Sequence, residues 1–254
     1  MSEKNPIHFV GAGPGDPELI TVKGQRLLAE AELVVYAGSL VPKILIENLT
    51  AEVHDSAPLH LDEIISLMSK AWQQGKKVVR LHTGDPAIYG AIREQMGELD
   101  KENIPYLVVP GVSSATATAA ALKAELTLPE VSQTVIITRR AGRTPVPEGE
   151  DLPSLAAHQA TMLILLSVGM IDKVVADLLS GGYPETTPVS VVEKVSWPEE
   201  RIIRGTINDI AAKVKEAGIT KTAIIAVGEA FGQGDLTAVS KLYDKGFAHG
   251  CREV

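Results

Sequence analysis

Two short turns with the sequence Gly-Asp-Pro constrain the fold of this chain more than any other feature. One lies in the stretch Val10–Pro17 and the other in the stretch Leu81–Gly90. Each turn follows a short apolar run that is typical of a buried strand. Open α/β folds bind their ligands where the carboxyl ends of such strands leave the sheet. The two turns therefore predict an α/β enzyme that acts on a small molecule, with its site at this edge.

The first half of the chain alternates short strand-like runs with longer helix-like runs, which favours a mostly parallel sheet. Apolar residues between positions 61 and 72 follow the 3.6-residue period of a helix, and Gly75 marks its end. The predicted strands are Ile7–Val10, Leu33–Tyr36, Lys77–Leu81 and Tyr106–Val109. The predicted helices are Leu19–Ala31, Leu61–Gln74, Ala87–Asp100 and Ser113–Leu122.

The second half contains more strand, and its sheet is expected to be mixed, with helices on both faces. Two strand-like runs, Pro188–Val195 and Arg201–Ile207, are separated only by Trp197–Glu200 and are predicted to pair as a hairpin. The Pro- and Gly-rich stretch Gly142–Pro153 is predicted to be a loop. The other predicted elements are the strands Val131–Thr138, Thr161–Leu166 and Ala223–Val227 and the helices Ile171–Leu179 and Asn208–Ala217.

This change of character predicts two α/β domains, over residues 1–125 and 126–235, followed by a tail over residues 236–254. We expect a binding cleft between the two halves, where ligand sites commonly form. The length of 254 residues is sufficient for two small domains with substantial cores.

Charge and cysteine content exclude several function classes. The formal net charge of −8 disfavours a nucleic-acid-binding protein, because such proteins present a basic face. The single cysteine, Cys251, excludes an intrachain disulfide and a multi-cysteine metal site. The N-terminus has no apolar signal region, and no apolar run approaches the roughly 18 residues of a membrane span. These features predict a cytoplasmic enzyme.

The first turn contains Gly11-Ala12-Gly13, which invites a dinucleotide-binding interpretation. Pro14 argues against it, because proline has no N–H to donate to a phosphate. Asp16 stands where the third glycine of that motif would lie. Asp16 and Glu18 are also expected to place negative charge at the start of the first helix, which would repel a pyrophosphate. The cofactor is therefore predicted not to be a phosphate-bound nucleotide.

Two further turns carry polar residues at the predicted sheet edge. In Thr83-Gly84-Asp85-Pro86, Gly84 allows close approach of a ligand, while Asp85 either caps a helix continuing from Ala87 or serves the ligand. In the stretch Pro110–Ala115, small residues favour tight helix packing, and the hydroxyls of Ser113 and Ser114 are placed to bind a polar ligand. These two readings, structural and functional, remain open for both turns.

Basic residues of the second half are candidate anion contacts, or alternatively parts of an exposed basic loop. They are Arg139, Arg140, Arg143, Lys194, Arg201 and Arg204. The six histidines show no metal-ligand spacing. His82 is interpreted as a strand residue with its hydrogen bonds satisfied rather than as a base. No catalytic triad or nucleophile elbow is present, so covalent catalysis is not expected.

Taken together, these motifs resemble the tetrapyrrole methylases, a family that uses S-adenosylmethionine. The resemblance lies in Val10–Thr21, Leu81–Gly90, Val109–Ala121 and Lys221–Glu229. It implies a two-domain α/β homodimer with the cofactor between the domains and a tetrapyrrole as substrate. Further motifs resemble the subgroup that methylates precorrin-4 or cobalt-precorrin-4 at ring carbon 11 in vitamin B12 synthesis. These are Val35–Val41, Val195–Glu200 with Arg204–Thr206, and the tail His249–Arg252.

The resemblance also implies site residues. The implied cofactor contacts are Pro14, Thr83, Gly84, Asp85, Ile88, Ser113, Ser114, Leu166, Ala223 and Ile224. The proposed substrate contacts are Tyr36, Ser39, Arg139, Arg140 and Lys194, chosen because a carboxylate-bearing tetrapyrrole requires local cations. Thr222 departs from the family, in which many members have proline at this position. Methyl transfer from a sulfonium requires neither a metal nor a nucleophilic side chain, and no residue is assigned as the base.

Three alternatives stay open. The acceptor could be another precorrin, uroporphyrinogen III, a diphthamide precursor or an rRNA ribose, although the negative charge disfavours RNA and Ala37–Leu40 disfavours uroporphyrinogen III. A Rossmann-fold oxidoreductase would have an acidic residue at the end of the second strand, where Tyr36-Ala37-Gly38 offers none. A non-catalytic carrier would bind the ligand without turnover.

Overall fold

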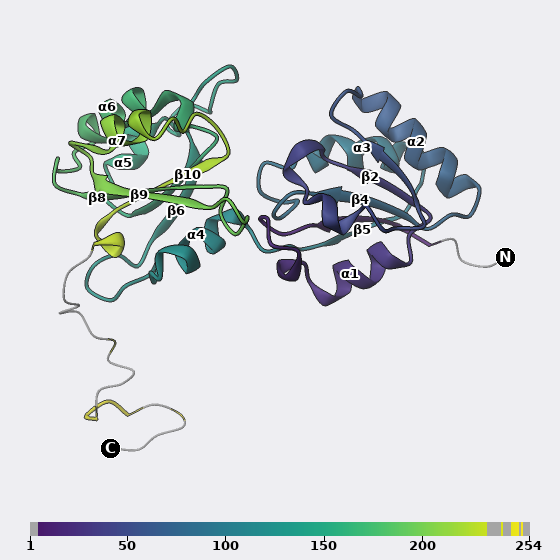
Figure 1. Ribbon diagram of the computed structural model, residues 1–254, viewed down its shortest axis with the longest axis horizontal. Helices are drawn as coiled ribbons and strands as arrows, with labels where there is room; N and C mark the ends of the chain where they lie inside the picture. Colours follow the sequence, from purple (N-terminus) through teal and green to yellow (C-terminus); the bar gives the residue numbers. More distant parts are fainter. Residues whose placement is uncertain (1–4, 233–239, 241–244, 249, 251–254) are drawn as a thin grey trace. The chain divides into compact units, whose positions relative to one another are not determined.

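The computed structural model describes residues 5–232, 240, 245–248 and 250 (Figure 1). Its contacts divide the chain into two compact units. The first unit is Met1–Ala117 with Ser196–Glu199, and the second is Thr118–Val195 with Glu200–Val254. The domain boundary near residue 125 stays a prediction, and most of the predicted tail, including His249, Cys251 and Arg252, lies outside the described residues.

The first unit contains a five-stranded sheet in the order β3-β2-β4-β1-β5, in which every neighbouring pair is parallel. The predicted parallel sheet is therefore confirmed. The strands are β1 (Ile7–Gly11), β2 (Leu33–Tyr36), β3 (Glu52–Asp55), β4 (Val78–His82) and β5 (Tyr106–Val109). Strand β3 was not predicted, because its sequence Glu-Val-His-Asp is polar and it lies at the edge of the sheet.

Helices cover both faces of this sheet, as expected for parallel strands, and its three central strands are largely buried. On one face, β-strand residues such as Phe9 and Val35 pack against α2 (Leu61–Gln73) and α3 (Ile92–Lys101). On the other face, Val10 and its neighbours pack against α1 (Val22–Ala29). Figure 1 shows α1 on one side of the sheet and α2 and α3 on the other.

Two helices of the first unit begin three or more residues later than predicted. Helix α1 begins at Val22 because Pro17–Leu19 forms a separate 3₁₀ turn, after which Ile20 is extended. Helix α3 begins at Ile92, not Ala87, because its N-cap residue Ala91 has the left-handed φ of 48°. In both places the chain makes an extra turn before the helix, next to the ends of β1 and β4.

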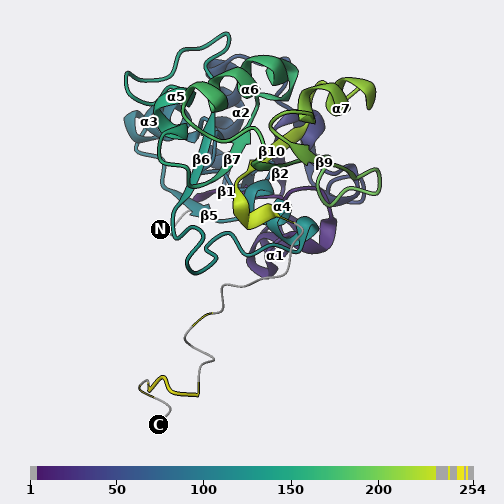
Figure 2. The same cartoon turned by 90° about the vertical axis from the view of Figure 1, so that its left-hand side faces the viewer.

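The second unit contains a mixed five-stranded sheet in the order β6-β7-β10-β8-β9, as predicted. The pair β6–β7 is parallel and the other pairs are antiparallel; β6, β7 and β10 lie side by side in Figure 2. The predicted hairpin is confirmed by the register in which Glu193 faces Arg201. The strands are β6 (Val135–Arg139), β7 (Thr161–Leu165), β8 (Pro188–Glu193), β9 (Arg201–Thr206) and β10 (Ala223–Val227).

Helices α5, α6 and α7 bury one face of this sheet in a single apolar cluster that includes Met162, Val191 and Ile225. These three helices are α5 (Leu152–Ala156), α6 (Ile171–Ser180) and α7 (Ile210–Glu216). Helix α4 (Ser114–Leu122) begins in the first unit and ends in the second. Helix α5 begins within the last residues of the predicted loop, where Asp151 caps it by accepting from Ser154 N at 3.1 Å. Within the described part of the chain, no helix has the length and apolar character needed to cross a membrane.

Candidate functional site at the strand ends

Three turns of the first unit meet at the carboxyl ends of β1, β4 and β5. We call them the first turn (Ala12–Asp16), the second turn (Thr83–Ile88) and the third turn (Pro110–Ser113). Gly13 N donates to Gly84 O at 3.3 Å, and Gly84 N donates to Gly13 O at 2.7 Å. The three strands are parallel neighbours, so the sheet brings these turns together as the sequence predicted.

Three glycines allow the backbones of these turns to approach closely. A β-carbon on Gly111 would lie 2.2 Å from Gly84 O and 2.8 Å from Gly11 Cα. A β-carbon on Gly11 would lie 2.6 Å from Gly111 Cα. Gly84 also has a φ of 60°, which favours glycine. At Gly11 and Gly111, no other residue type fits without movement of the backbone.

The side chain of Asp85 links the second turn to the third. Its Oδ1 accepts from Ala87 N at 2.8 Å, and its Oδ2 accepts from Gly111 N at 3.0 Å. Of the two interpretations of Asp85, capping of a helix that continues from Ala87 does not hold, because α3 begins at Ile92. Asp85 instead closes a local turn and holds the third turn in place.

The other predicted residues of these turns have local roles. Thr83 Oγ1 donates to Leu40 O at 3.1 Å and so links the second turn to the segment after β2. Ile88 N closes the second turn by donating to Asp85 O at 3.1 Å. In the third turn, Ser113 Oγ accepts from Ala115 N at 3.2 Å at the start of α4, whose first residue is Ser114.

The first turn is held by a segment far along the sequence that belongs to the same unit, Ser196–Glu199. Trp197 Nε1 donates to Pro14 O at 2.9 Å, and Asp16 N donates to Ser196 Oγ at 3.0 Å. A β-carbon on Gly15 would lie 2.2 Å from Trp197 Cδ1, so the indole fits only against glycine. From the sequence, Trp197 was assigned to a hairpin turn and to a motif of the subgroup resemblance. Its contact with Pro14 was not predicted, because no local signal indicates a contact across 183 positions.

The expected role of Asp16 and Glu18 at the start of the first helix was wrong. Asp16 Oδ1 accepts from Glu18 N at 2.9 Å and caps the 3₁₀ turn that precedes α1. Thr21 caps α1 by accepting from Gly24 N at 3.1 Å, and the first turn of α1 contains no acidic residue.

Buried polar groups lie within the first sheet. Arg80 is buried and donates from Nε to Gln95 Oε1 at 2.9 Å and from NH1 to Val35 O at 3.1 Å. Burial lowers its pKa to about 10, while the charge of Asp55 opposes this shift. Burial also raises the pKa of Tyr36, and the Asp55 carboxylate raises it further. Ser39, the neighbouring predicted substrate contact, lies in the 3₁₀ turn Gly38–Leu40.

His82 is buried at the end of β4, with 3% of its surface exposed. The interpretation that its hydrogen bonds are satisfied was wrong, because Nε2 is buried and has no hydrogen-bond partner among the described residues. Burial lowers the pKa of His82 to about 3, and the nearby charge of Arg80 adds to this effect. The imidazole is therefore neutral near pH 7, packed against Phe9 with ring centroids 6.0 Å apart.

The second unit gathers the remaining predicted residues at one edge of its sheet. Parallel β6 and β7 end there, at Arg139 and Leu165, while antiparallel β10 begins there at Ala223. Strand β8 also ends there, since Glu193 pairs with Ala223. The residues brought together at this edge are Arg139, Arg140, Leu166, Lys194, Ala223 and Ile224.

Three non-glycine residues at this edge have left-handed backbones. Their φ angles are 56° for Leu166, 47° for Lys194 and 55° for Thr222. Lys194 N donates to Thr222 O at 2.8 Å. Each such residue costs of order 1–3 kcal/mol, and strain of this kind clusters at functional sites. Leu166 is also 68% exposed, whereas Ala223 and Ile224 are buried.

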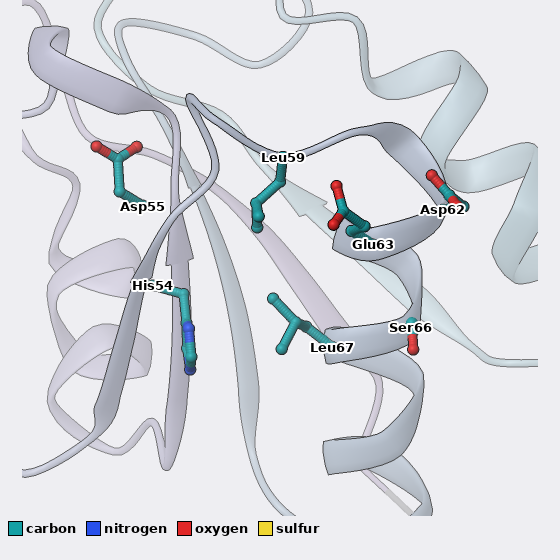
Figure 3. A pocket seen from close by; sticks show the side chains of 7 residues that line it. All are labelled: His54, Asp55, Leu59, Asp62, Glu63, Ser66 and Leu67. Carbon is teal, nitrogen blue, oxygen red and sulfur yellow. The ribbon is translucent and has the colours of Figure 1, made fainter.

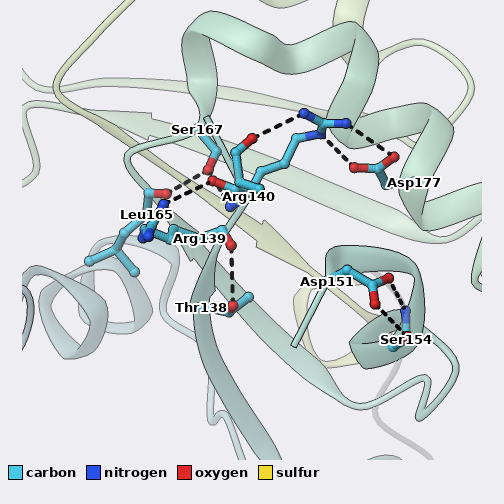
Figure 4. A network of polar contacts seen from close by, with 9 residues as sticks. Thr138, Arg139, Arg140, Asp151, Ser154, Leu165, Ser167 and Asp177 are labelled. Atoms are coloured by element: carbon cyan, nitrogen blue, oxygen red, sulfur yellow. Dashed lines mark hydrogen bonds and ion pairs between the residues drawn. The ribbon is translucent and has the colours of Figure 1, made fainter. Parts of the chain in front are cut away.

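Three of the six candidate cationic residues are already bound by their own chain. Arg139 donates to Thr144 O at 3.2 Å and to Pro145 O at 2.6 Å, which anchors the loop before α5. Arg140 pairs with Asp177 at 2.5 Å (Figure 4), and Arg201 pairs with Glu193 at 2.6 Å. The other three form no ion pair with a described residue; they are Arg143, Lys194 and Arg204.

A pocket of about 480 Å³ lies elsewhere in the first unit, beside β3 and α2 (Figure 3). It is lined by His54, Asp55, Leu59, Asp62, Glu63, Ser66 and Leu67. None of the predicted cofactor or substrate residues lines it. Across the described ranges, no group of three or more His, Cys, Asp or Glu side chains is arranged to hold a metal ion.

Comparison with known proteins places this arrangement in a family. The family model of the tetrapyrrole (corrin/porphyrin) methylases matches residues 6–211. A cobalt-precorrin-4 C(11)-methyltransferase from Methanocaldococcus jannaschii is 58% identical over 255 residues, covering 100% of this chain and 98% of that protein.

Solved structures agree with this placement. The crystal structure of a cobalamin biosynthetic enzyme, cobalt precorrin-4 methyltransferase, has a TM-score of 0.88 and 48% identity, covering 89% of this chain and 96% of that one. A Thermus thermophilus uroporphyrin-III C-methyltransferase, solved with S-adenosylhomocysteine, has a TM-score of 0.75 and 29% identity, covering 89% of this chain and 93% of that one. The chain is therefore a member of the tetrapyrrole methylase family.

Proposed function

We propose that this chain is an S-adenosylmethionine-dependent methyltransferase that methylates ring carbon 11 of precorrin-4 or cobalt-precorrin-4 in cobalamin biosynthesis. The products are (cobalt-)precorrin-5 and S-adenosylhomocysteine. One observation carries this proposal, the 58% identity along the whole chain to an enzyme of that activity. The rival acceptor, uroporphyrinogen III, is less well supported, because the solved uroporphyrin-III C-methyltransferase is only 29% identical in sequence to this chain.

The cofactor contacts that we propose lie on the strand-end turns of each unit. They are Pro14, Thr83, Gly84, Asp85, Ile88, Ser113 and Ser114 in the first unit and Leu166, Ala223 and Ile224 in the second. Backbone carbonyls and a carboxylate suit a cationic sulfonium. The glycines of the first unit support this assignment, because they let the backbone come close to a ligand.

The substrate contacts that we propose are Tyr36, Ser39, Arg139 and Lys194. A tetrapyrrole with several carboxylate arms requires cations, although the chain as a whole is acidic. Lys194 is the strongest candidate, because its ammonium forms no ion pair with a described residue and its backbone is held in a strained conformation. Arg140, the remaining predicted contact, is instead bound by Asp177.

The reaction is an in-line displacement. The ring carbon attacks the methyl group, the bond from methyl to sulfur breaks, and S-adenosylhomocysteine leaves as a neutral thioether. The positive charge passes with the methyl group to the ring system, which then loses a proton to give the product. Alignment of donor and acceptor can supply about 7–11 kcal/mol of the barrier reduction in favourable cases. The task of the protein is therefore to hold two ligands in line, which suits rigid turns tied together by hydrogen bonds.

The enzyme is proposed to be a cytoplasmic homodimer. Edge strand β5 exposes two large apolar residues, Leu107 at 49% and Val108 at 41%, which a second copy would cover. Sedimentation equilibrium of the purified chain tests this directly. A mass of 27.0 kDa at micromolar concentration would contradict the dimer.

Calorimetric titration with S-adenosylhomocysteine, with NAD as the control, tests the cofactor class. Saturable binding of the first ligand alone is expected, and binding of NAD alone would restore the oxidoreductase alternative. Methyl transfer from labelled S-adenosylmethionine is then measured with precorrin-4, cobalt-precorrin-4 and uroporphyrinogen III as acceptors. Labelling of a precorrin-4 form at carbon 11 is expected, and labelling of uroporphyrinogen III alone would contradict the proposed acceptor.

A further inference from the structure

Figure 4 shows a polar network around the end of β7 that the proposed reaction does not use directly. We propose that Ser167, Arg140 and Asp177 are positioning residues that hold Leu166 in the conformation required for cofactor binding. This inference rests on the proposed function, in which Leu166 is a cofactor contact. It gives Arg140 a role different from the substrate contact predicted from the sequence.

Leu166 requires such support because of its own geometry. It is a bulky residue with a φ of 56° and a side chain that is 68% exposed. A left-handed backbone at a residue of this kind persists only where the surrounding structure enforces it. Its exposed side chain gains little from burial, so neighbouring interactions must fix the segment.

Ser167 supplies the first of these interactions. It is completely buried, its hydroxyl donates to Leu165 O at 2.7 Å, and it accepts from Arg140 N at 2.9 Å. The hydroxyl thus fixes the residue before Leu166 and links it to the end of β6. Alanine at position 167 would leave a buried donor and a buried acceptor without partners.

Arg140 and Asp177 supply the second interaction that fixes this segment. Arg140 Nε donates to Asp177 Oδ2 at 2.5 Å, and NH2 donates to Asp177 Oδ1 at 3.5 Å. NH1 donates to Ala141 O at 3.1 Å. Asp177 lies on α6, the helix that follows Leu166, so this ion pair ties that helix to the end of β6. A guanidinium held in this way is not directed at the carboxylates of a substrate.

Ser167→Ala and Asp177→Asn test the inference, with Asp172→Asn as the matched control. Asp172 lies on the same helix, but its carboxylate forms an ion pair with Lys215 at 2.6 Å, whereas Arg140 pairs with Asp177. Asp177→Asn keeps one acceptor for Arg140, so it provides a milder variant if Ser167→Ala does not fold. Affinity for S-adenosylhomocysteine is measured by calorimetry well below the unfolding temperature of each variant.

Both test variants are expected to bind S-adenosylhomocysteine about ten-fold more weakly, the effect of one lost hydrogen bond, while the control binds normally. The KM for S-adenosylmethionine should rise with kcat little changed. Unchanged affinity in both folded test variants would overturn the inference. So would an Arg140→Gln variant that raises only the KM for the tetrapyrrole. Failure of the wild-type chain to bind S-adenosylhomocysteine would instead overturn the proposed function itself.

Discussion

Asp85 Oδ2 accepts a hydrogen bond from the backbone N–H of Gly111 at 3.0 Å, across two turns that are 26 positions apart. The other carboxylate oxygen accepts from Ala87 N. A carboxylate is suited to this position because both of its oxygens are acceptors. The aspartate of the second Gly-Asp-Pro motif is therefore explained first by the architecture of the sheet edge, on which ligand binding then depends.

Asp85→Asn should weaken both stability and cofactor binding. One of the two backbone donors would then face an amide NH₂ group and lose its acceptor. A buried donor left unsatisfied in this way lowers the free energy of unfolding by about 1–3 kcal/mol. Urea unfolding and S-adenosylhomocysteine titration measure the two effects. Asp151→Asn is the matched control, because Asp151 also accepts from a backbone N–H, that of Ser154, but at the start of α5. Equal loss of affinity in both variants would contradict the specific role of Asp85.

Gly111→Ala should destabilise the first unit severely. The new methyl group would lie 2.2 Å from a backbone oxygen that cannot move independently, so we expect a loss of about 3 kcal/mol in the free energy of unfolding. Gly97→Ala is the control in which the same substitution causes no clash, because Gly97 lies in α3 with nothing within 4 Å of the added carbon. That variant should gain up to about 1 kcal/mol from helix propensity. Chemical denaturation of both variants measures the contrast.

Trp197→Phe should loosen the first turn by removing the hydrogen bond to Pro14 O, at a cost of about 1 kcal/mol. The chain has only two tryptophans, so Trp72→Phe leaves Trp197 as a fluorescent reporter of this turn. Emission of the Trp72→Phe variant should change on titration with S-adenosylhomocysteine, because Pro14 is a proposed cofactor contact. If emission changed in the Trp197→Phe variant but not in the Trp72→Phe variant, the placement of the cofactor beside Trp197 would be contradicted.

Local patterns were sufficient to predict most of the fold. The bounds of β2, β5 and β10 match the predicted ones, since each of these strands is a continuous apolar run. The same reasoning failed at β3, where a polar edge strand has no such signal. It also failed at the start of α3, where Ala91 adopts a left-handed conformation that alanine rarely takes.

The candidate site, like the fold, could be predicted from the sequence only in part. The meeting of the three glycine-containing turns follows from the parallel order of the strands, so sequence reasoning could anticipate it. The contacts of Trp197 with Pro14 and of Asp177 with Arg140 join residues 183 and 37 positions apart. Only the folded chain shows such pairings, because nothing in the local sequence specifies a partner.

Thr222 should tolerate glycine but not proline. Its φ of 55° is unfavourable for a β-branched residue, and glycine would relieve that strain by about 1 kcal/mol. Proline fixes φ near −65° and would force the start of β10 to rearrange, together with the Thr222 O that accepts from Lys194 N. Thermal unfolding should therefore rank Thr222→Gly at or above the wild type and Thr222→Pro well below it. A fully stable proline variant would show that this backbone conformation is not required.

His82 should make stability fall as the pH is lowered from neutrality. Burial holds its pKa near 3 in the folded chain, whereas the unfolded chain binds a proton near the ordinary value of 6.5. Between these values only the unfolded state is protonated, so the free energy of unfolding falls by up to about 1.4 kcal/mol per pH unit and levels off below about pH 3. In His82→Leu this contribution is absent. Urea unfolding at pH 6 and pH 4.5 should therefore show the wild type losing about 2 kcal/mol more than the variant. Equal losses in the wild type and in His82→Leu would mean that burial does not keep His82 from binding a proton in the folded chain at these pH values.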